Sequence, residues 1–227
     1  MSTRGKRYNQ LIKKINKNKI YSTDEALDLI LTNTTEKFDA GVEIHLRLGI
    51  DPQKTEQQVK GTVTLPHGTG KSKTIAALVE PAKEKEAQEA GADIIGGEEL
   101  ITEIKKTEKT NFDIAVATPE MMPKIAVIAK ILGTRGLMPS PKNETVTPNI
   151  KKTIEELKKG KIAFKNDNAA NLHQLIGKIS FGKKKLKENL DIFLEAVKKS
   201  KPASAKGTYI KNATLCTSMG PGVKIAL

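Results

Sequence analysis

The sequence Leu65-Pro66-His67-Gly68-Thr69-Gly70 marks the point at which the periodicity of this 227-residue chain changes. Before it, between residues 42 and 48, apolar residues alternate with Glu43, His45 and Arg47, which is the pattern of a strand with one buried face. After it, short apolar runs alternate with segments of helical spacing. The second pattern is typical of a parallel sheet with helices packed on it. We therefore predict that a different domain begins here.

The middle of the chain contains a series of predicted strands and helices. The strands are Ile75–Val79, Asp93–Ile95 and Phe112–Ala117, and the helices are Pro81–Ala90, Glu98–Lys106, Pro119–Leu132 and Pro148–Gly160. The two ends of the chain have a different character. They are predicted to form helices around Tyr8–Ile15, from the capping-box sequence Ser22–Glu25 and over Lys183–Lys199, and strands at 42–48, Val59–Leu65, Lys161–Phe164, Ile176–Phe181 and, finally, Thr208–Thr217.

This arrangement predicts one domain inserted into another. Residues 1–66 and 160–227 are expected to form one discontinuous domain, and residues 67–159 the inserted one. The chain then crosses between the domains twice, at segments that contain glycine. We predict a hinge there, formed by Pro66, His67, Gly68, Gly70, Lys159 and Gly160.

The net charge of +13 is unevenly distributed along the chain. Residues 67–159 contain 15 lysines and arginines against 14 aspartates and glutamates, which leaves +1 there and +12 for the two ends together. A concentration of basic residues in one part of a protein is the electrostatic footprint of a polyanion, because phosphate neutralisation releases counterions. We therefore expect the discontinuous domain to bind nucleic acid.

Several classes of protein are excluded by the composition. No apolar run reaches 18 residues, and no apolar region follows the basic start at Met1–Arg7, so neither a membrane span nor a cleaved secretion signal is expected. A single cysteine, Cys216, cannot form an internal disulfide, and with three histidines it makes no standard zinc site. We predict no metal, no cofactor, no membrane partner and no catalytic residue set.

A nucleotide-binding enzyme is the alternative from another class. The run Gly68-Thr-Gly-Lys71-Ser72 has the composition of a phosphate-binding loop, but Leu65 stands where the first glycine of that motif is required. The run is therefore interpreted as a turn or hinge. The inserted α/β domain as a nucleotide site remains the alternative hypothesis.

The C-terminal run Thr217-Ser218-Met219-Gly220-Pro221-Gly222 is uncharged, although its surroundings are basic. Its glycines and proline allow a tight bend that exposes main-chain N–H groups, two hydroxyls and a thioether. We expect this bend to contact RNA.

Two further positions are candidate contacts, each with a structural alternative. Phe38, beside Lys37, could stack on an unpaired base or a sugar, although a single phenylalanine is more often part of a core. His173 could bond to a ribose or a phosphate, or be a structural histidine. The lysine cluster 183–187 adds to the basic field or is only a solvated helix end.

These residues and several others resemble the bacterial-type ribosomal protein L1 family. The resemblance runs through nearly the whole chain, in order, at Lys37-Phe38-Asp39, Leu48–Pro52, Lys60–Lys71, Gly91-Ala92-Asp93, Leu132–Lys142, Ile176–Phe181 and Met219–Gly222. It implies a split ferredoxin-like α+β domain with an inserted three-layer, Rossmann-like α/β domain. It also implies a protein that is not an enzyme.

The resemblance further implies binding to 23S rRNA at the mobile L1 stalk, assistance in the movement and release of exit-site tRNA, and repression of the protein's own mRNA. A monomer is implied away from the ribosome, in the bacterial cytoplasm or the plastid stroma. The RNA-contact positions that it implies are Lys37, Phe38, Glu43, His173, Thr217, Ser218, Met219 and Gly220. An RNA-binding assembly factor or repressor that acts away from the ribosome is the milder alternative.

The chain departs from the family pattern at two places. Relatives often have Ser-Thr where this chain has Thr217-Ser218, and a small apolar residue and glycine where it has Asn143-Glu144. The second difference affects the expected shape of the loop in the inserted domain.

Overall fold

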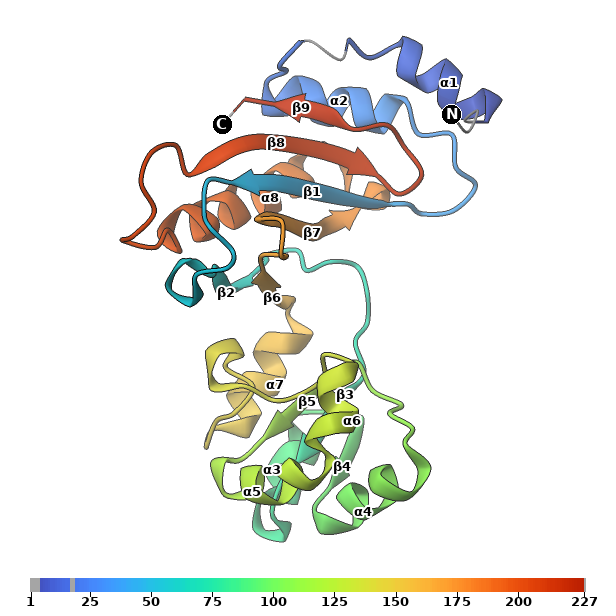
Figure 1. Cartoon of the computed structure of the whole chain (residues 1–227). Helices are drawn as coiled ribbons and strands as arrows, with labels where there is room; N and C mark the ends of the chain where they lie inside the picture. The colour runs from blue at the N-terminus through green and yellow to red at the C-terminus, as the bar shows by residue number, and fades with distance from the viewer. Residues whose placement is uncertain (1–4, 17–18, 227) are drawn as a thin grey trace. The chain divides into compact units, whose positions relative to one another are not determined.

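The structure is a computed structural model, and it describes residues 5–16 and 19–226. It divides the chain into two compact units: unit 1 takes the chain up to Gly70 and from Ile162 onward, and unit 2 is Lys71–Lys161. These boundaries lie within four residues of the predicted ones. Figure 1 shows the elements of each unit.

The elements are mixed helices and strands in both units. At the two ends of the chain they are α1 (Lys6–Lys13), α2 (Thr23–Thr32), β1 (Gly41–Leu48), η1 (Thr55–Gln57), β2 (Lys60–Thr64), β6 (Lys161–Lys165), β7 (Asn171–Lys178), η6 (Ile179–Phe181), α8 (Gly182–Lys199), β8 (Ile210–Thr217) and β9 (Val223–Ile225). Between them lie β3 (Ile75–Leu78), η2 (Pro81–Lys83), α3 (Glu84–Glu89), β4 (Ile94–Gly96), α4 (Glu98–Thr107), β5 (Ile114–Ala117), η3 (Pro119–Met121), α5 (Met122–Ile125), η4 (Ala126–Ile128), α6 (Ala129–Thr134), η5 (Pro141–Asn143) and α7 (Ile150–Lys158). The predicted mixed α/β class is confirmed.

The main sheet of unit 1 has the strand order β7-β1-β8-β9, and all of its neighbours are antiparallel. Val42, Ile44 and Leu46 of β1 are fully buried in a core that includes residues of α2 and α8. The helices therefore cover one face of this sheet, as the alternation in β1 predicts. A separate two-stranded sheet pairs β2 with β6.

The sheet of unit 2 is parallel, with the order β4-β3-β5. All four residues of β3 are buried, but on alternate faces. Ala76 and Leu78 pack in a cluster with residues of α4, α5 and α6, whereas Ile75 and Ala77 pack with residues of α3 and α7. Helices thus cover both faces, as in other parallel sheets.

Helix α2 begins as its sequence predicts. The Ser22 hydroxyl accepts a bond from the Glu25 N–H, and the Glu25 carboxylate accepts one from the Ser22 N–H. This reciprocal pair satisfies two backbone donors that the first helical turn leaves free.

The prediction of a strand over Ile176–Phe181 was wrong in its boundaries. Strand β7 starts earlier, at Asn171, and residues 179–181 form a 3-10 turn. The turn forms because the N–H and hydroxyl of Ser180 both donate to the Asp39 carboxylate, and because Gly182, at φ 74°, then directs the chain into α8.

Two other predicted elements differ from the structure. The strand ending at Thr217 is not the last, because β9 follows and pairs with it. The helix predicted over Pro119–Leu132 is broken into η3, α5, η4 and α6. Prolines 119 and 123 lie at the starts of η3 and α5, where the missing N–H of proline is tolerated.

The segment Pro66–Gly70 is held against α8 by a fully buried amide. Asn189 accepts a bond from the His67 N–H at 3.2 Å and donates to the carbonyls of Gly68 and Ile176 at 3.0 and 2.8 Å. Gly68 and Gly70 adopt φ values of 62° and 72°, which favour glycine. The sequence gives no spacing signal that would single out Asn189.

The segment after Gly70 also bears on the nucleotide-binding alternative. A phosphate-binding loop leads directly into a helix, whose N-terminal N–H groups bind the phosphates. Here Lys71 and Ser72 lead into strand β3. The geometry therefore agrees with the mismatch in sequence spacing.

Candidate RNA-binding surface

The face of the unit 1 sheet that α2 and α8 leave uncovered is formed mostly by polar side chains. Across the register, His173, His45, Thr214 and Lys224 form one row over the four strands. Leu175, Glu43 and Cys216 form a second row. We call these two rows the outer face; Figure 1 shows the four strands that carry them.

One end of this sheet is closed by the turn between β8 and β9. The Ser218 N–H donates to the Gly41 carbonyl at 2.8 Å, and the Gly220 N–H donates to the Thr217 carbonyl at 2.9 Å. Met219 has φ 67°, in the left-handed region, and is 69% exposed. A residue other than glycine is held there only by its surroundings, and such positions are concentrated at functional sites.

Thr217 and Gly220 form the inside of this turn. Thr217 is only 6% exposed, and its Oγ1 lies 2.1 Å from the place where a Cβ at residue 220 would stand. Only glycine fits there without a shift. The Thr217 hydroxyl therefore packs within the turn, whereas Ser218 is half-buried and Met219 faces solvent.

Helix α1 also contacts the turn, through a residue that sequence reasoning missed. The Arg7 guanidinium donates to the Met219 carbonyl at 3.1 Å and to the Glu36 carboxylate at 2.5 Å. Arg7 thus joins the turn to the segment that precedes Lys37. Its sequence context is a run of basic residues, which does not distinguish it from its neighbours.

The segment that contains Lys37 and Phe38 is followed by two residues, Asp39 and Gly41, that hydrogen bonds fix in place. Asp39 accepts the two bonds from Ser180, and these bonds hold the pKa of the Asp39 carboxyl below its usual value. Gly41 is held by Ser218 on the other side. Phe38 is 56% exposed, so it is not a core residue. Its ring is available to a partner.

The structure places the predicted contacts other than the buried Thr217 on one surface, but not at one point. Lys37, Phe38, Ser218, Met219 and Gly220 lie at the end of the sheet where β1 begins. Glu43 lies two residues along β1. His173 pairs with His45, four residues along, which is about 13 Å at the usual strand rise.

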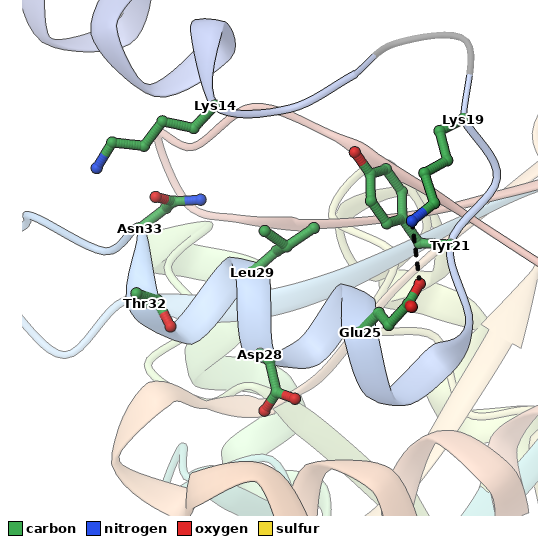
Figure 2. A pocket seen from close by; sticks show the side chains of 8 residues that line it. All are labelled: Lys14, Lys19, Tyr21, Glu25, Asp28, Leu29, Thr32 and Asn33. Atoms are coloured by element: carbon green, nitrogen blue, oxygen red, sulfur yellow. Dashed lines mark ion pairs between the residues drawn. The ribbon is translucent and has the colours of Figure 1, made fainter.

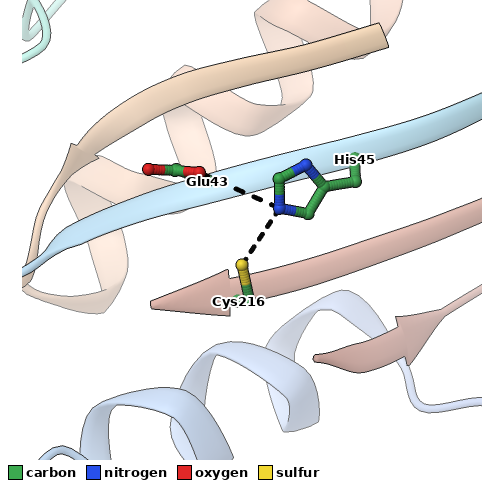
Figure 3. Close-up of side chains that lie close together, drawn as sticks. All are labelled: Glu43, His45 and Cys216. Atoms are coloured by element: carbon green, nitrogen blue, oxygen red, sulfur yellow. Dashed lines mark hydrogen bonds and ion pairs between the residues drawn. The ribbon is translucent and has the colours of Figure 1, made fainter. Parts of the chain in front are cut away.

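His173 belongs to a cluster of side chains on the outer face, of which Figure 3 shows Glu43, His45 and Cys216. The Nδ1 atoms of His45 and His173 lie 2.8 Å apart. His45 Nε2 lies 3.1 Å from Cys216 Sγ and 3.9 Å from Glu43 Oε2. His45 and Cys216 were not predicted as site residues, although the alternation of β1 places His45 on the polar face.

The environment of the cluster shifts two pKa values. Partial burial, and secondly His173, lower the pKa of His45, although Glu43 acts in the opposite direction. Burial, with a smaller contribution from Glu43, raises the pKa of the Cys216 thiol to about 11. Cys216 is therefore a protonated thiol near neutral pH, not a reactive thiolate.

The lysine cluster of α8 is partly neutralised. Lys183 Nζ lies 2.5 Å from an Asp28 carboxylate oxygen, and Lys187 Nζ lies 2.6 Å from one of Asp24. Lys184 and Lys185 are exposed. The cluster therefore contributes less positive field than its four charges predict.

A pocket lies beside α2 (Figure 2). It is lined by Lys14, Lys19, Tyr21, Glu25, Asp28, Leu29, Thr32 and Asn33. Lys19 lies 3.7 Å from Glu25 and 4.8 Å from the centre of the Tyr21 ring. Its cationic and anionic groups are balanced, so the pocket is not a basic groove of the kind that binds a phosphate backbone.

Comparison with known proteins identifies the family. The sequence pattern of the ribosomal protein L1p/L10e family matches residues 30–221. The chain belongs to this family. Family membership confirms the resemblance seen in the sequence, and it also confirms the prediction of a protein that is not an enzyme. Within residues 5–16 and 19–226, no helix has the length and apolar character needed to cross a membrane.

The relatives within the family are similar over almost their whole length. The chain is 48% identical to the large ribosomal subunit protein uL1 of Mycoplasma capricolum over 225 residues, which cover 99% of both chains. It is 50% identical to the protein of the same name from Mesoplasma florum over 213 residues, which cover 94% of this chain and 93% of the relative. Both relatives are bacterial proteins.

Proposed function

We propose that this chain is a constituent of the large ribosomal subunit and binds 23S rRNA at the mobile L1 stalk through unit 1. The observation that carries the proposal is the end of the outer face. There, Phe38 and Met219 are both exposed. The bond from the Ser218 N–H to the Gly41 carbonyl joins the two segments that carry them. The names of the bacterial relatives support assembly into the large subunit.

Each proposed contact has a distinct chemistry. Phe38 offers a ring on which an unpaired base or a ribose can stack. Glu43 would repel a phosphate, but its carboxylate can accept a bond from a ribose 2′-OH or a base amine. The uncharged turn supplies shape and hydrogen bonds, whereas lysines elsewhere in unit 1 supply the salt-dependent attraction that any RNA feels.

Two finer parts of the function are proposed for the same surface. We propose that the stalk-bound chain assists the movement of exit-site tRNA, and that it represses its own mRNA where that RNA has the same folded site. Since the relatives are bacterial, we place it in the bacterial cytoplasm rather than in a plastid, as a monomer when it is not on the ribosome.

Filter binding to a stalk rRNA fragment and to an unrelated hairpin tests the main proposal. Phe38→Ala and Met219→Ala should each weaken binding to the stalk fragment by about 1 to 3 kcal/mol, the usual scale of a specific contact, and change hairpin binding little. Val127→Ala is the matched control, because Val127 is an exposed apolar residue of unit 2. Unchanged selectivity in both variants would contradict the proposed contacts.

A second experiment separates ribosomal residence from action elsewhere. The chain should sediment with large subunits in high salt, and an RNA with the sequence of its own message should compete with the stalk fragment. If the message RNA competes with the stalk fragment but the chain is absent from the subunits, the chain acts as a repressor away from the ribosome.

A further inference from the structure

The cluster of Glu43, His45 and Cys216 has the donor atoms of a metal site. Its three ligand atoms, a carboxylate oxygen, an imidazole nitrogen and a sulfur, all lie within 4.8 Å of one another. Among the residues that the structure describes, this is the one group of three such side chains. Figure 3 shows the three side chains pointing toward one another from the adjacent strands β1 and β8.

We propose that Glu43, His45 and Cys216 bind a single Zn²⁺ ion on the outer face of unit 1. Ligands of a tetrahedral zinc ion lie about 3.3 to 3.7 Å apart, given the usual zinc–ligand bond lengths. The two separations from His45 Nε2, 3.1 Å to sulfur and 3.9 Å to oxygen, lie on either side of that range. The Glu43 oxygen and the Cys216 sulfur lie within 4.8 Å of each other, so side-chain rotations that bring these two atoms closer would complete the geometry.

The backbone fixes the three ligands relative to one another. Glu43 and Cys216 are direct partners in the register of β1 and β8, and Glu43 and His45 are alternate residues on the same face of β1. Sites built on strands hold their ligands more accurately than sites built on loops. The three side chains are half-buried, so an ion can reach them from solvent.

The second nitrogen of His45 has the partner that a metal ligand requires. Metal-bound histidines almost always donate their other N–H to an acceptor, which fixes the ring and its tautomer. With zinc on Nε2, His45 Nδ1 carries the proton and donates to His173 Nδ1, 2.8 Å away. His173 then carries its own proton on Nε2, which lies 3.7 Å from the Asp167 carboxylate. His173 is thus a positioning residue.

Asp167 is itself fixed. It accepts bonds from the N–H groups of Asn171 and Ala169, at 2.6 and 2.9 Å, and from the Asn171 amide at 3.2 Å. A hydrogen bond therefore joins His173 to His45, and the fixed Asp167 carboxylate lies 3.7 Å from the other ring nitrogen of His173. In many zinc sites a carboxylate bonds directly to the ligating histidine, whereas here a second histidine lies between them.

The donor set selects zinc over the common hard cations. Mg²⁺ and Ca²⁺ prefer oxygen ligands, whereas a thiolate with an imidazole favours zinc or a similarly soft ion. On binding, the Cys216 thiol loses its proton to the buffer and its sulfur forms the bond to the ion. Three protein ligands leave a fourth position open to water or to an oxygen of a bound partner. Such an open site differs from the closed, four-ligand zinc site that the sequence excludes.

Metal titration of the intact, purified chain without RNA tests this site independently of the proposed function. Titration with Zn²⁺ should give one ion per chain, with one proton released, and Co²⁺ should produce a thiolate charge-transfer absorption. Cys216→Ser should remove that absorption, and both Cys216→Ser and His45→Gln should weaken Zn²⁺ binding at least tenfold. His67→Gln is the matched control, since His67 bonds to Glu188 outside the cluster.

The positioning role of His173 has its own outcome. His173→Gln should keep the cobalt–thiolate absorption but weaken Zn²⁺ binding by roughly tenfold to a hundredfold, as is usual for the partner of a ligating histidine. Circular dichroism verifies that each variant is folded. Zn²⁺ affinity that is unchanged in Cys216→Ser and His45→Gln, or Co²⁺ binding without the thiolate absorption, would overturn the proposal.

Discussion

The sheets of the two units differ in how many of their faces are covered. In unit 2, helices pack on both faces of the parallel sheet, and every residue of β3 is buried. In unit 1, helices pack on one face of the antiparallel sheet, and Glu43, His45 and Cys216 line the other. A covered sheet offers a partner only its strand ends, whereas an open one offers a whole row of side chains. The open sheet is therefore the one that can present functional side chains to a partner.

The charge follows the same division. Unit 2, Lys71–Lys161, has 16 basic and 14 acidic residues, a net charge of +2, which leaves +11 of the total of +13 for the rest of the chain. The unit with the open sheet is thus also the basic one. RNA binding is expected to divide in the same way.

Separating the units should have the largest effect. Unit 1 alone, with Gly70 joined to Ile162 by a short glycine–serine linker, should retain the affinity of the full chain for the stalk fragment within about tenfold. Unit 2 alone should fall to non-specific binding, which is roughly a thousandfold weaker or more. Filter binding at several salt concentrations measures both. Tight, selective binding by unit 2 alone would reverse the assignment.

A methyl group inside the turn should have the next largest effect. Gly220→Ala places a Cβ against Thr217 Oγ1, so we expect a loss of about 1 to 3 kcal/mol in the unfolding free energy of unit 1, the usual result of overpacking. In the double variant with Thr217→Ala, part of that loss should disappear because the obstructing hydroxyl is gone. Urea denaturation of the parent, the two single variants and the double variant gives the coupling energy. If the two single losses of unfolding free energy simply add in the double variant, residues 217 and 220 do not clash.

Met219 should separate stability from binding. Met219→Gly relieves the left-handed backbone, so it should raise stability by roughly 0.5 to 1 kcal/mol while weakening binding to the stalk fragment. Met219→Ala retains the strained φ, so it should lose affinity without becoming more stable. Thermal unfolding and filter binding of the same samples make the comparison. Equal stability of the two variants would show that φ 67° is not costly here.

The smallest effect should come from Glu144 of unit 2. Glu144 has φ 55° and forms an ion pair with the buried ammonium of Lys161, which Glu156 also contacts at 2.8 Å. Burial acts to lower the Lys161 pKa, but its bonds to the two carboxylates outweigh this effect and raise it. Glu144→Gly removes one of the two carboxylates from the buried ammonium but leaves Glu156 paired with it, and it relieves the backbone, so its stability should stay within about 1 kcal/mol of the parent.

Glu144→Ala is the informative companion. It loses the same ion pair but keeps the strained φ, so it should be about 1 kcal/mol less stable than Glu144→Gly. Chemical denaturation of unit 2 measures the difference. If the alanine variant is as stable as the glycine variant, the left-handed backbone at residue 144 is not costly.

The alternation of polar and apolar residues was sufficient to predict the mixed α/β class and the buried faces of the most regular elements. Strand β1 and helix α8 have clean periods, and their buried faces lie where those periods place them. Strand β7 was mispredicted because its alternation is interrupted. A register shift opposite Val42 and Glu43 disturbs the pairing, and Gly177 has no side chain with which to show a face. Strand β9 was missed because it is only three residues long, which is too short for its alternation to be recognised.

The candidate site was predicted only as far as local sequence allows. The flexible, uncharged turn and the pair Lys37-Phe38 are recognisable in the sequence, and Phe38 and Met219 are indeed exposed. The bond from Arg7 to Met219, and the proximity of His45, His173 and Cys216, depend on strand pairing between distant segments. No spacing rule in a single sequence reveals such pairings.

The strand order of unit 1 has a consequence for synthesis. Strand β1, Gly41–Leu48, lies between β7 and β8, which begin only at Asn171 and Ile210. The parallel sheet of unit 2 is complete by Ala117. As the chain grows from its N-terminus, the α/β unit can fold while β1 still has two unpaired edges, and those edges invite association with other chains. A product that ends before Ile210 should therefore aggregate rather than compete for RNA.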